Sequence, residues 1–143
     1  MYTIKKVTNL EKSLQKFPDS YFDIVIANPM PKTEKWGIYP SKDVTRELFR
    51  LAEKVAYIDE HNGAIYIYTR AGYLEDQPLV SYEDAILSLC KSGDLVLDFT
   101  CGTSHVAEAC AKLGQDFVGL ETDLRLYKRK IESVKNGFGY AIV

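Results

Sequence analysis

Residues 94–123 read DLVLDFTCGTSHVAEACAKLGQDFVGLETD, and this stretch decides which fold the chain is expected to adopt. An apolar strand ends at Asp98, a turn of small residues follows, and a helix with apolar spacing covers about 105–113. A second apolar strand then ends at Glu121. This order of strand, turn, helix and strand is typical of units that bind nucleosides at the carboxyl ends of parallel strands.

The turn and the two acids have the properties that a nucleoside site requires. Gly102 can adopt a positive φ without steric cost, and the following helix begins with unpaired N–H groups. Asp98 and Glu121 are 23 positions apart, near the separation of about 20 at which a second-strand carboxylate meets a ribose. Only one of the three glycines of a dinucleotide fingerprint is present, which disfavours a nicotinamide cofactor. An ordinary strand–helix–strand unit, whose acids only cap helices, stays open as an alternative.

Composition limits the class of protein. The chain has 143 residues, a net charge of −2 and 46% hydrophobic residues, which suits one globular domain with a real core. A free-standing nucleic-acid binder usually has a basic excess, so any such partner must be met by a local patch. The three cysteines have neither zinc nor disulfide spacing, and no apolar run approaches about 18 residues. We therefore expect a soluble cytoplasmic protein that makes no membrane contact.

The rest of the chain alternates strand and helix patterns. Further strands are expected at 1–7, 22–27 and 64–68, and further helices at 9–16, 41–55, 81–91 and 123–135. Residues 70–78 are expected to form a loop, and 138–143 an edge strand. About five core strands and five helices in this order predict an α/β fold with a mostly parallel, doubly wound sheet.

A second strand end carries polar chemistry. The apolar run FDIVIA at 22–27 ends at Asn28, and the prolines at 29 and 31 exclude regular structure beyond it. If this strand and the one ending at Asp98 are neighbours, both ends line one crevice of the sheet. The Asn28 side-chain carbonyl then accepts a hydrogen bond from an exocyclic amine. The alternative is a proline-rich loop that only terminates a strand, with Asn28 as a capping or turn residue.

Taken together, these segments resemble the DNA amino-methyltransferases, which methylate adenine N6 or cytosine N4 with S-adenosylmethionine. Residues 22–31, FDIVIANPMP, are similar to the family's catalytic motif, an apolar strand followed by (Asp/Asn/Ser)-Pro-Pro-(Tyr/Phe/Trp). Residues 93–105, GDLVLDFTCGTSH, resemble its cofactor motif GD-x-V-L-D-P-F-x-G-S-G-T, and 112–121, KLGQDFVGLE, resemble K-L-G-R-x-F-I-G-I-E. Gln77-Pro78 is similar to the start of Q-K-P-x-x-L. The catalytic motif precedes the cofactor motif, as in the permuted branch of the family.

The resemblance implies a Rossmann-like class I methyltransferase fold, reduced in size. It implies one domain over 1–143, with a catalytic half at about 1–70 and a cofactor half at about 77–143. Relatives usually insert a target-recognition segment, whereas only about 70–78 occupies that interval here, so we expect no separate target-recognition domain. The implied reaction is methyl transfer from S-adenosylmethionine to an exocyclic amine of DNA, adenine N6 in preference to cytosine N4, as in restriction–modification. The implied partner is DNA, bound weakly or non-specifically by the chain alone, with a homo-oligomer or a recognition subunit supplying specificity.

The resemblance also assigns site residues. The catalytic positions are Asn28, Pro29, Met30 and Pro31. The cofactor-binding positions are Asp98, Phe99, Thr100, Cys101, Gly102, Glu121, Thr122 and Pro78. No metal is implied.

Among the departures from the family motifs, those at four positions bear most on the site. Met30 and Pro31 replace the second proline and the aromatic residue, while Ser104 and His105 replace a glycine and a threonine. The departures at 104 and 105 are expected to narrow the cofactor pocket. Two alternatives therefore stay open: a catalytically weakened relative that binds S-adenosylmethionine or a protein partner, and a methyltransferase acting on a small-molecule or protein amine.

Basic residues cluster in two places. Four lie around the catalytic junction and suit a phosphate backbone: Lys32, Lys35, Lys42 and Arg46. Four more form a run on the last predicted helix, where a solvated face is the usual explanation: Arg125, Lys128, Arg129 and Lys130.

Overall fold

The computed structural model describes residues 1–29 and 40–138 of the chain. Met30, Pro31, Lys32 and Lys35 therefore lie outside the described residues, as does the edge strand expected at the C-terminus, apart from its first residue. Within the described residues, none of the helices is long and apolar enough to cross a membrane.

Strands and helices follow one another along the chain. The strands are β1 (Tyr2–Lys6), β2 (Ile24–Ala27), β3 (Lys54–Asp59), β4 (Ala64–Thr69), β5 (Gly72–Pro78), β6 (Leu95–Asp98) and β7 (Asp116–Glu121). The helices are α1 (Leu10–Gln15), α2 (Lys42–Leu51), α3 (Tyr82–Leu89), α4 (Val106–Leu113) and α5 (Leu124–Phe138).

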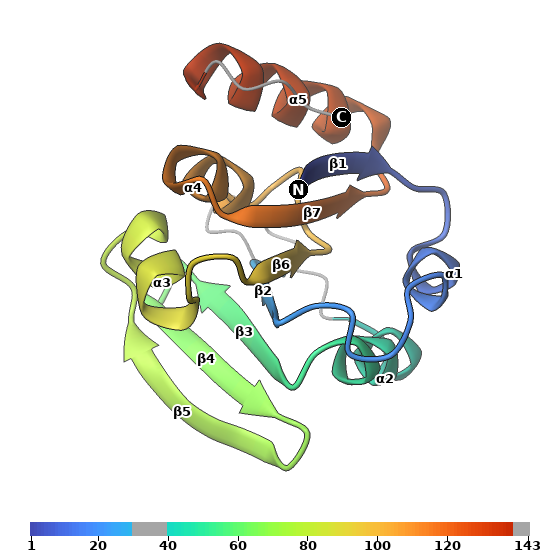
Figure 1. The fold of residues 1–143 in the computed structure, drawn as a ribbon, viewed down its shortest axis with the longest axis vertical. Coiled ribbons are helices and arrows are strands. Elements are labelled where there is room, and N and C mark those ends of the chain that lie inside the picture. Colours follow the sequence, from blue (N-terminus) through green and yellow to red (C-terminus); the bar gives the residue numbers. More distant parts are fainter. Residues whose placement is uncertain (30–39, 139–143) are drawn as a thin grey trace.

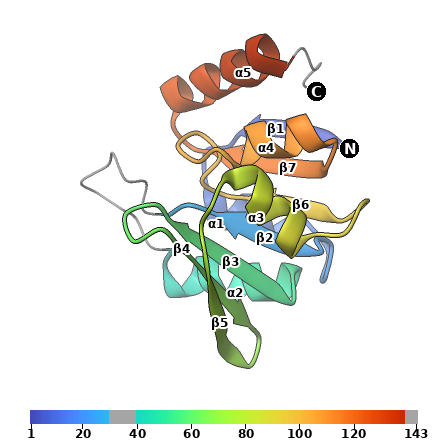
Figure 2. The same cartoon turned by 90° about the vertical axis from the view of Figure 1, so that its left-hand side faces the viewer.

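All seven strands belong to one sheet with the order β1-β7-β6-β2-β3-β4-β5 (Figure 1). The five strands from β1 to β3 in this order pair in parallel, whereas β4 and β5 pair antiparallel. β5 thus lies at the opposite edge of the sheet from β1 (Figure 2). The predicted α/β class with a mostly parallel sheet is confirmed.

Helices cover both faces of the sheet. α1 and α2 pack on one face, and α3, α4 and α5 pack on the other (Figure 1). The alternation of strand side chains produces two cores: in β2, Ile24 and Ile26 face α3 and α4, while Val25 faces α1 and α2. A short strand can therefore be apolar at every position, as Ile24–Ala27 is, because both of its faces are buried.

Three helices begin close to their predicted starts, and each has a side-chain cap. The side chains of Asn9, Ser41 and Ser81 each accept a hydrogen bond from the backbone N–H three residues later. Each of these bonds satisfies one of the four N–H groups that the start of a helix leaves unpaired.

The helix expected over 41–55 is wrong at its C-terminal end. The helix stops at Leu51, Ala52 is already extended at φ −149° and ψ 144°, and Val55 lies in β3 opposite Val25. The apolar spacing of α2 continues into Ala52 and Val55, so periodicity alone cannot locate the end. The helix ends before Val55 because residues from Lys54 onward pair with β2, and a β-branched Val suits a buried strand.

The loop expected over 70–78 is also wrong. Gly72–Pro78 forms β5, which pairs antiparallel with β4 and completes a hairpin at the edge of the sheet. Every residue of β5 except Gln77 is exposed, so the segment lacks the apolar alternation by which a strand is recognised. The sheet consequently has seven strands instead of the five core strands expected.

The order of the strands reverses between β6 and β2. β6 and β2 are parallel neighbours, yet β6 leads through α4 to β7 on one side, and β2 leads through α2 to β3 on the other. The two connecting helices lie on opposite faces of the sheet (Figure 1). Such a reversal opens a crevice at the carboxyl ends of the strands, which is where open α/β sheets bind ligands. The junctions after Ala27 and Asp98 meet there, as their sequences predict.

Gly119, in the middle of β7, provides a test of how closely β7 packs against Cys101 in the turn after β6. A Cβ at position 119 would overlap the Cys101 Sγ and lie 2.8 Å from the Phe117 ring. We expect Gly119→Ala to lower the free energy of unfolding by about 1–3 kcal/mol, as overpacking of a dense core does. Urea unfolding measures this, and the same substitution should cost less in a Cys101→Ala background. Equal costs in both backgrounds would contradict the proposed overlap.

Candidate active site at the carboxyl ends of β2 and β6

Asp98 organises the turn that follows β6. Its carboxylate is fully buried and accepts hydrogen bonds from the Thr100 N–H at 2.7 Å, the Thr100 hydroxyl at 2.6 Å and the Ser104 hydroxyl. Burial raises the pKa of Asp98 to about 6, although these three hydrogen bonds oppose the rise. The carboxylate thus points into the turn and sets its shape.

One hydroxyl joins this turn to the end of β2. The Asn28 backbone N–H donates to Thr100 Oγ1 at 2.9 Å, and the same hydroxyl donates to Asp98. The two sequence motifs, 72 residues apart at this contact, are therefore held together by a hydrogen bond.

The Asn28 side chain is buried among polar groups from two further elements. Its Nδ2 donates to Glu60 Oε1 at 3.1 Å and to the Tyr82 hydroxyl at 3.0 Å. Glu60 directly follows β3, and Tyr82 is the first residue of α3. Pro29 is also buried, so the first two residues of the catalytic motif are fixed in the crevice.

Glu121 ends β7 on the other side of the turn. One of its carboxylate oxygens accepts from the Gly102 N–H at 2.9 Å, and the other accepts from the Asp123 N–H at 2.8 Å. A Cβ at Gly102 would overlap Glu121 Oε1 and lie 2.6 Å from the Leu126 Cβ. Only glycine therefore allows the turn to approach this acid so closely.

Four other predicted cofactor positions occupy different surroundings. Phe99 is buried in the core beside α1 and α2, with its ring roughly perpendicular to that of Tyr57. Cys101 is fully buried, and burial raises the pKa of its thiol well above the usual value, which disfavours a nucleophilic thiolate. Thr122 is exposed directly after Glu121, and Pro78 is exposed at the end of β5, opposite Ala64.

The solvated face expected for the basic run on the last helix is wrong for Lys130. Lys128 and Arg129 on the same helix are at least partly exposed, but Lys130 is only 4% exposed. Its Nζ donates to the Ser104 carbonyl at 2.7 Å and to both carboxylate oxygens of Glu108 at 2.7 and 2.8 Å. These contacts connect α5 with α4 and with the turn after β6. One side of a helix can be solvated while the other is buried, so a run of charges does not give the position of each member.

Two departures from the family motif take part in this network. Ser104 is fully buried, with its hydroxyl directed at Asp98. His105 is exposed, and a hydrogen bond to Glu108 raises its pKa. The His105 ring lies perpendicular to the Tyr82 ring, with 5.4 Å between their centroids. Ser104 is therefore turned inward under the turn.

Sequence reasoning missed Glu60, Tyr82, Glu108 and Lys130. A usable signal existed for Glu60, since an acid at the carboxyl end of a parallel strand is the feature that identified Asp98 and Glu121. It was hidden because β3 overlaps the helix expected over 41–55. Glu108 and Lys130 had no such signal, because their pairing depends on how α4 and α5 pack.

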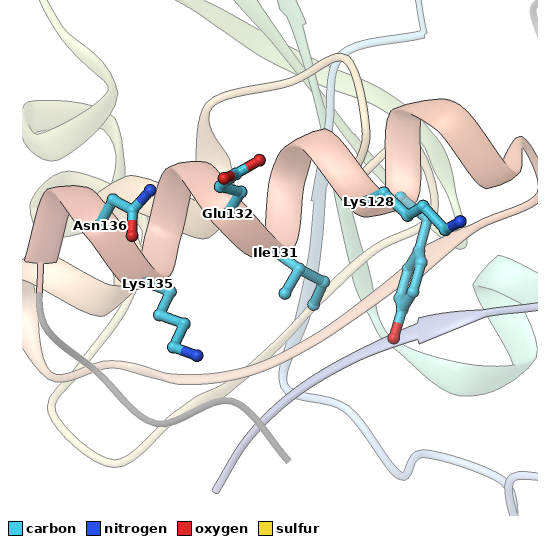
Figure 3. Close-up of a pocket in the computed structure, with 6 residues that line it drawn as sticks. Lys128, Ile131, Glu132, Lys135 and Asn136 are labelled. Carbon is cyan, nitrogen blue, oxygen red and sulfur yellow. The ribbon is translucent and has the colours of Figure 1, made fainter.

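A surface pocket lies elsewhere, along α5 (Figure 3). Its volume is about 330 Å³, and its lining is Tyr127, Lys128, Ile131, Glu132, Lys135 and Asn136. All six residues come from α5 and none belongs to the turn, so the pocket is separate from the candidate site. Among the described residues, no three His, Cys, Asp or Glu side chains are grouped to hold a metal ion.

Removing the Lys130 ammonium should destabilise the protein strongly. Lys130→Ala leaves the Glu108 carboxylate and the Ser104 carbonyl without their buried donor, and breaking such a pair costs about 3–5 kcal/mol. Lys128→Ala, on the more exposed side of the same helix, should change the free energy of unfolding by less than about 0.5 kcal/mol. Equal effects of the two substitutions in urea unfolding would contradict the buried ion pair.

The raised pKa of Asp98 predicts how stability depends on pH. Because the folded-state pKa is about 6 and the ordinary value is 3.8, ionisation of this carboxyl opposes folding. Relative to Asp98→Asn, the parent should therefore lose roughly 2 kcal/mol of unfolding free energy between pH 4 and pH 7. Urea unfolding across this range gives the difference, and carboxyl ¹³C NMR gives the titration midpoint. A midpoint near 4 would refute the prediction.

Comparisons with known proteins identify the family. A sequence profile of the DNA methylase family N6_N4_Mtase matches residues 5–132. No curated protein sequence matches the chain significantly.

Solved structures share the fold. TTHA0409 of Thermus thermophilus, assigned provisionally as a DNA modification methylase and complexed with S-adenosyl-L-methionine, superposes with a TM-score of 0.73. It is 14% identical, and the match covers 99% of this chain and 97% of that one. M1.HpyAVI superposes with a TM-score of 0.62 at 13% identity, covering 94% and 99% of the two chains. The predicted methyltransferase fold is confirmed, and since the family profile covers most of the sequence, the chain belongs to the N6_N4_Mtase family of DNA methylases.

Proposed function

We propose that the chain is an S-adenosylmethionine-dependent DNA methyltransferase that methylates an exocyclic amine, adenine N6 in preference to cytosine N4. The observation that carries the proposal is the hydrogen bond from the Asn28 N–H to Thr100 Oγ1. It places the end of the catalytic strand against the turn expected to hold the cofactor, at the reversal of strand order.

The residues around Gly102 suit the cofactor. Each carboxylate oxygen of Glu121 accepts one backbone N–H and retains a second lone pair, which a ribose hydroxyl can use. The turn is free of bulk at Gly102, where even a methyl group would collide with Glu121. TTHA0409 and M1.HpyAVI have both been solved with S-adenosylmethionine, which supports the same cofactor here. When bound, it supplies a methyl group activated by a positively charged sulfur.

Asn28 and Pro29 would act on the target amine. An amide or backbone carbonyl oxygen accepts a hydrogen bond from an N–H and thereby orients the nitrogen lone pair towards the methyl group. The nitrogen becomes positively charged as it gains the methyl group, and carbonyl oxygens stabilise this charge until a proton leaves. Positioning and preorganised electrostatics are the main contributions that such a site makes.

Two exposed basic residues of α2 are our candidates for contact with DNA. Lys42 and Arg46 lie at the start of α2, whose first turn faces the carboxyl edge of the sheet because α2 leads from β2 to the parallel strand β3. Both side chains are exposed and suit phosphate contacts, which carry no sequence information. We propose that the enzyme works in the cytoplasm, on DNA it binds non-specifically or with specificity from a second copy or a recognition subunit.

Labelled methyl transfer tests the function. We expect label from S-adenosylmethionine to enter unmodified DNA, and nucleoside analysis to identify N6-methyladenine or, as the other outcome, N4-methylcytosine. Asn28→Ala should reduce the rate at least about 100-fold, as loss of a preorganised polar group does. Asn62→Ala is the matched control, because Asn62 lies in an exposed turn.

Calorimetry tests the cofactor assignment separately. Glu121→Gln should weaken S-adenosylmethionine binding, since an amide nitrogen replaces one of two acceptor oxygens. Binding without transfer to DNA would favour the weakened relative or another amine substrate. Parent and Glu121→Gln proteins that both fail to bind would refute the cofactor.

A further inference from the structure

The Asn28 amide belongs to a closed ring of hydrogen bonds. Its Nδ2 donates to Glu60 Oε1 at 3.1 Å and to the Tyr82 hydroxyl at 3.0 Å. The Tyr82 hydroxyl in turn donates to the same Glu60 oxygen in a short hydrogen bond. Three side chains from three elements thus converge on one another, and the Asn28 side chain among them is fully buried.

The ring is held rigidly by its surroundings. Tyr82 begins α3, whose start is capped by Ser81, and its ring packs against that of His105 beside the cofactor turn. Burial and the hydrogen bond to Glu60 raise the Tyr82 pKa, so the hydroxyl stays a donor at neutral pH. Glu60 follows β3, the strand that pairs with β2. The ring therefore joins the strand end that carries Asn28 to its neighbour and to α3.

This arrangement determines how the amide is oriented. The Asn28 Nδ2 donates on one side, towards Glu60 Oε1 and the Tyr82 hydroxyl, which are themselves hydrogen-bonded to each other. The planar amide cannot rotate without breaking both bonds, so its oxygen is fixed on the side away from Glu60 and Tyr82. A carboxylate that accepts from Nδ2 also draws positive charge to the nitrogen, and the oxygen becomes correspondingly more negative.

We propose that Glu60 and Tyr82 are positioning residues for methyl transfer, which orient the Asn28 amide and increase the negative charge on its oxygen. The inference rests on the proposed function, because the charge matters only when an amine becomes positive beside that oxygen. It adds two residues that the catalytic motif itself does not contain.

Side-chain NMR tests the ring without any reaction. In ¹⁵N-labelled parent protein, the Asn28 amide proton that faces Glu60 and Tyr82 should be shifted downfield and exchange slowly. Glu60→Gln and Tyr82→Phe should each move this signal, while the exposed Asn62 amide, which donates to Asp59 at 2.8 Å, serves as the internal reference. Asn28 signals that do not move in folded variants, as judged by circular dichroism, would overturn the proposal.

A polarity exchange tests the role in catalysis. Asn28→Asp sets two carboxylates within hydrogen-bond distance, and Glu60→Gln removes the charge that polarises the amide. Each substitution should lower kcat about 10- to 100-fold, the equivalent of one hydrogen bond to a charged group, with little change in the KM for DNA. In the double variant Asn28→Asp/Glu60→Gln, the donor is the amide at position 60 and the acceptor is the carboxylate at position 28. Because this restores a donor–acceptor pair, the double variant should have a higher kcat than either single variant.

The outcomes separate this inference from the proposed function. A double variant no faster than Asn28→Asp, or a kcat unaffected by Glu60→Gln, would overturn the inference while an active parent upholds the function. A parent that transfers no methyl group would overturn both. A structural role alone would lower kcat only in variants that also lose stability in urea unfolding, so a lowered kcat in single variants as stable as the parent, with recovery in the double variant, identifies positioning.

Discussion

The site depends on the single hydroxyl group of Thr100. Its oxygen accepts from the Asn28 backbone N–H at 2.9 Å while its hydrogen is donated to Asp98 at 2.6 Å. Pairing of β2 with β6 brings the two strand ends to the same edge of the sheet, but the hydroxyl fixes their relative height. A valine of the same shape would fill the space without supplying either bond, and would leave Asp98 with one donor fewer. The Thr100 hydroxyl therefore holds the end of β2 against the turn that follows β6.

Charge compensation beneath the turn explains why α5 belongs to the site. A fully buried carboxylate is costly, and Asp98 retains a pKa of about 6 even with three hydrogen bonds. The charge of Lys130 favours its ionised form, and Lys130 is itself neutralised by Glu108, whose pKa is raised by burial but lowered overall by His105 and Lys130. The charged groups are thus an acid in β6 (Asp98), a base in α5 (Lys130) and an acid in α4 (Glu108). The last helix, α5, supports the turn after β6 and does not only cover the sheet.

The sequence predicted the local patterns and failed where partners are distant. β6, α4 and β7 could be predicted because an apolar strand, a glycine-containing turn and a periodic helix are each visible within about ten residues. Asn28, Asp98 and Glu121 could be singled out because polar residues at strand ends are exposed to ligands in this type of sheet. The end of α2 was mistaken because Val55 continues a helical period, and β5 was missed because its exposed residues show no period. Glu60 and Lys130 owe their positions to tertiary packing, which no short window contains.

The departures at 104 and 105 are better explained as compensated changes than as loss of a site. A glycine at 104 would remove the hydroxyl that Asp98 accepts, and the buried carboxylate would lose one of the hydrogen bonds that lower its pKa. His105 connects Glu108 with the ring of Tyr82, and so joins the support of the turn to the residues around Asn28. Within the described residues, every buried side-chain nitrogen and oxygen has a hydrogen-bond partner. An unpaired buried group would cost about 1–3 kcal/mol. The complete pairing therefore shows that Ser104 and His105 are accommodated in the turn after β6 without such a cost.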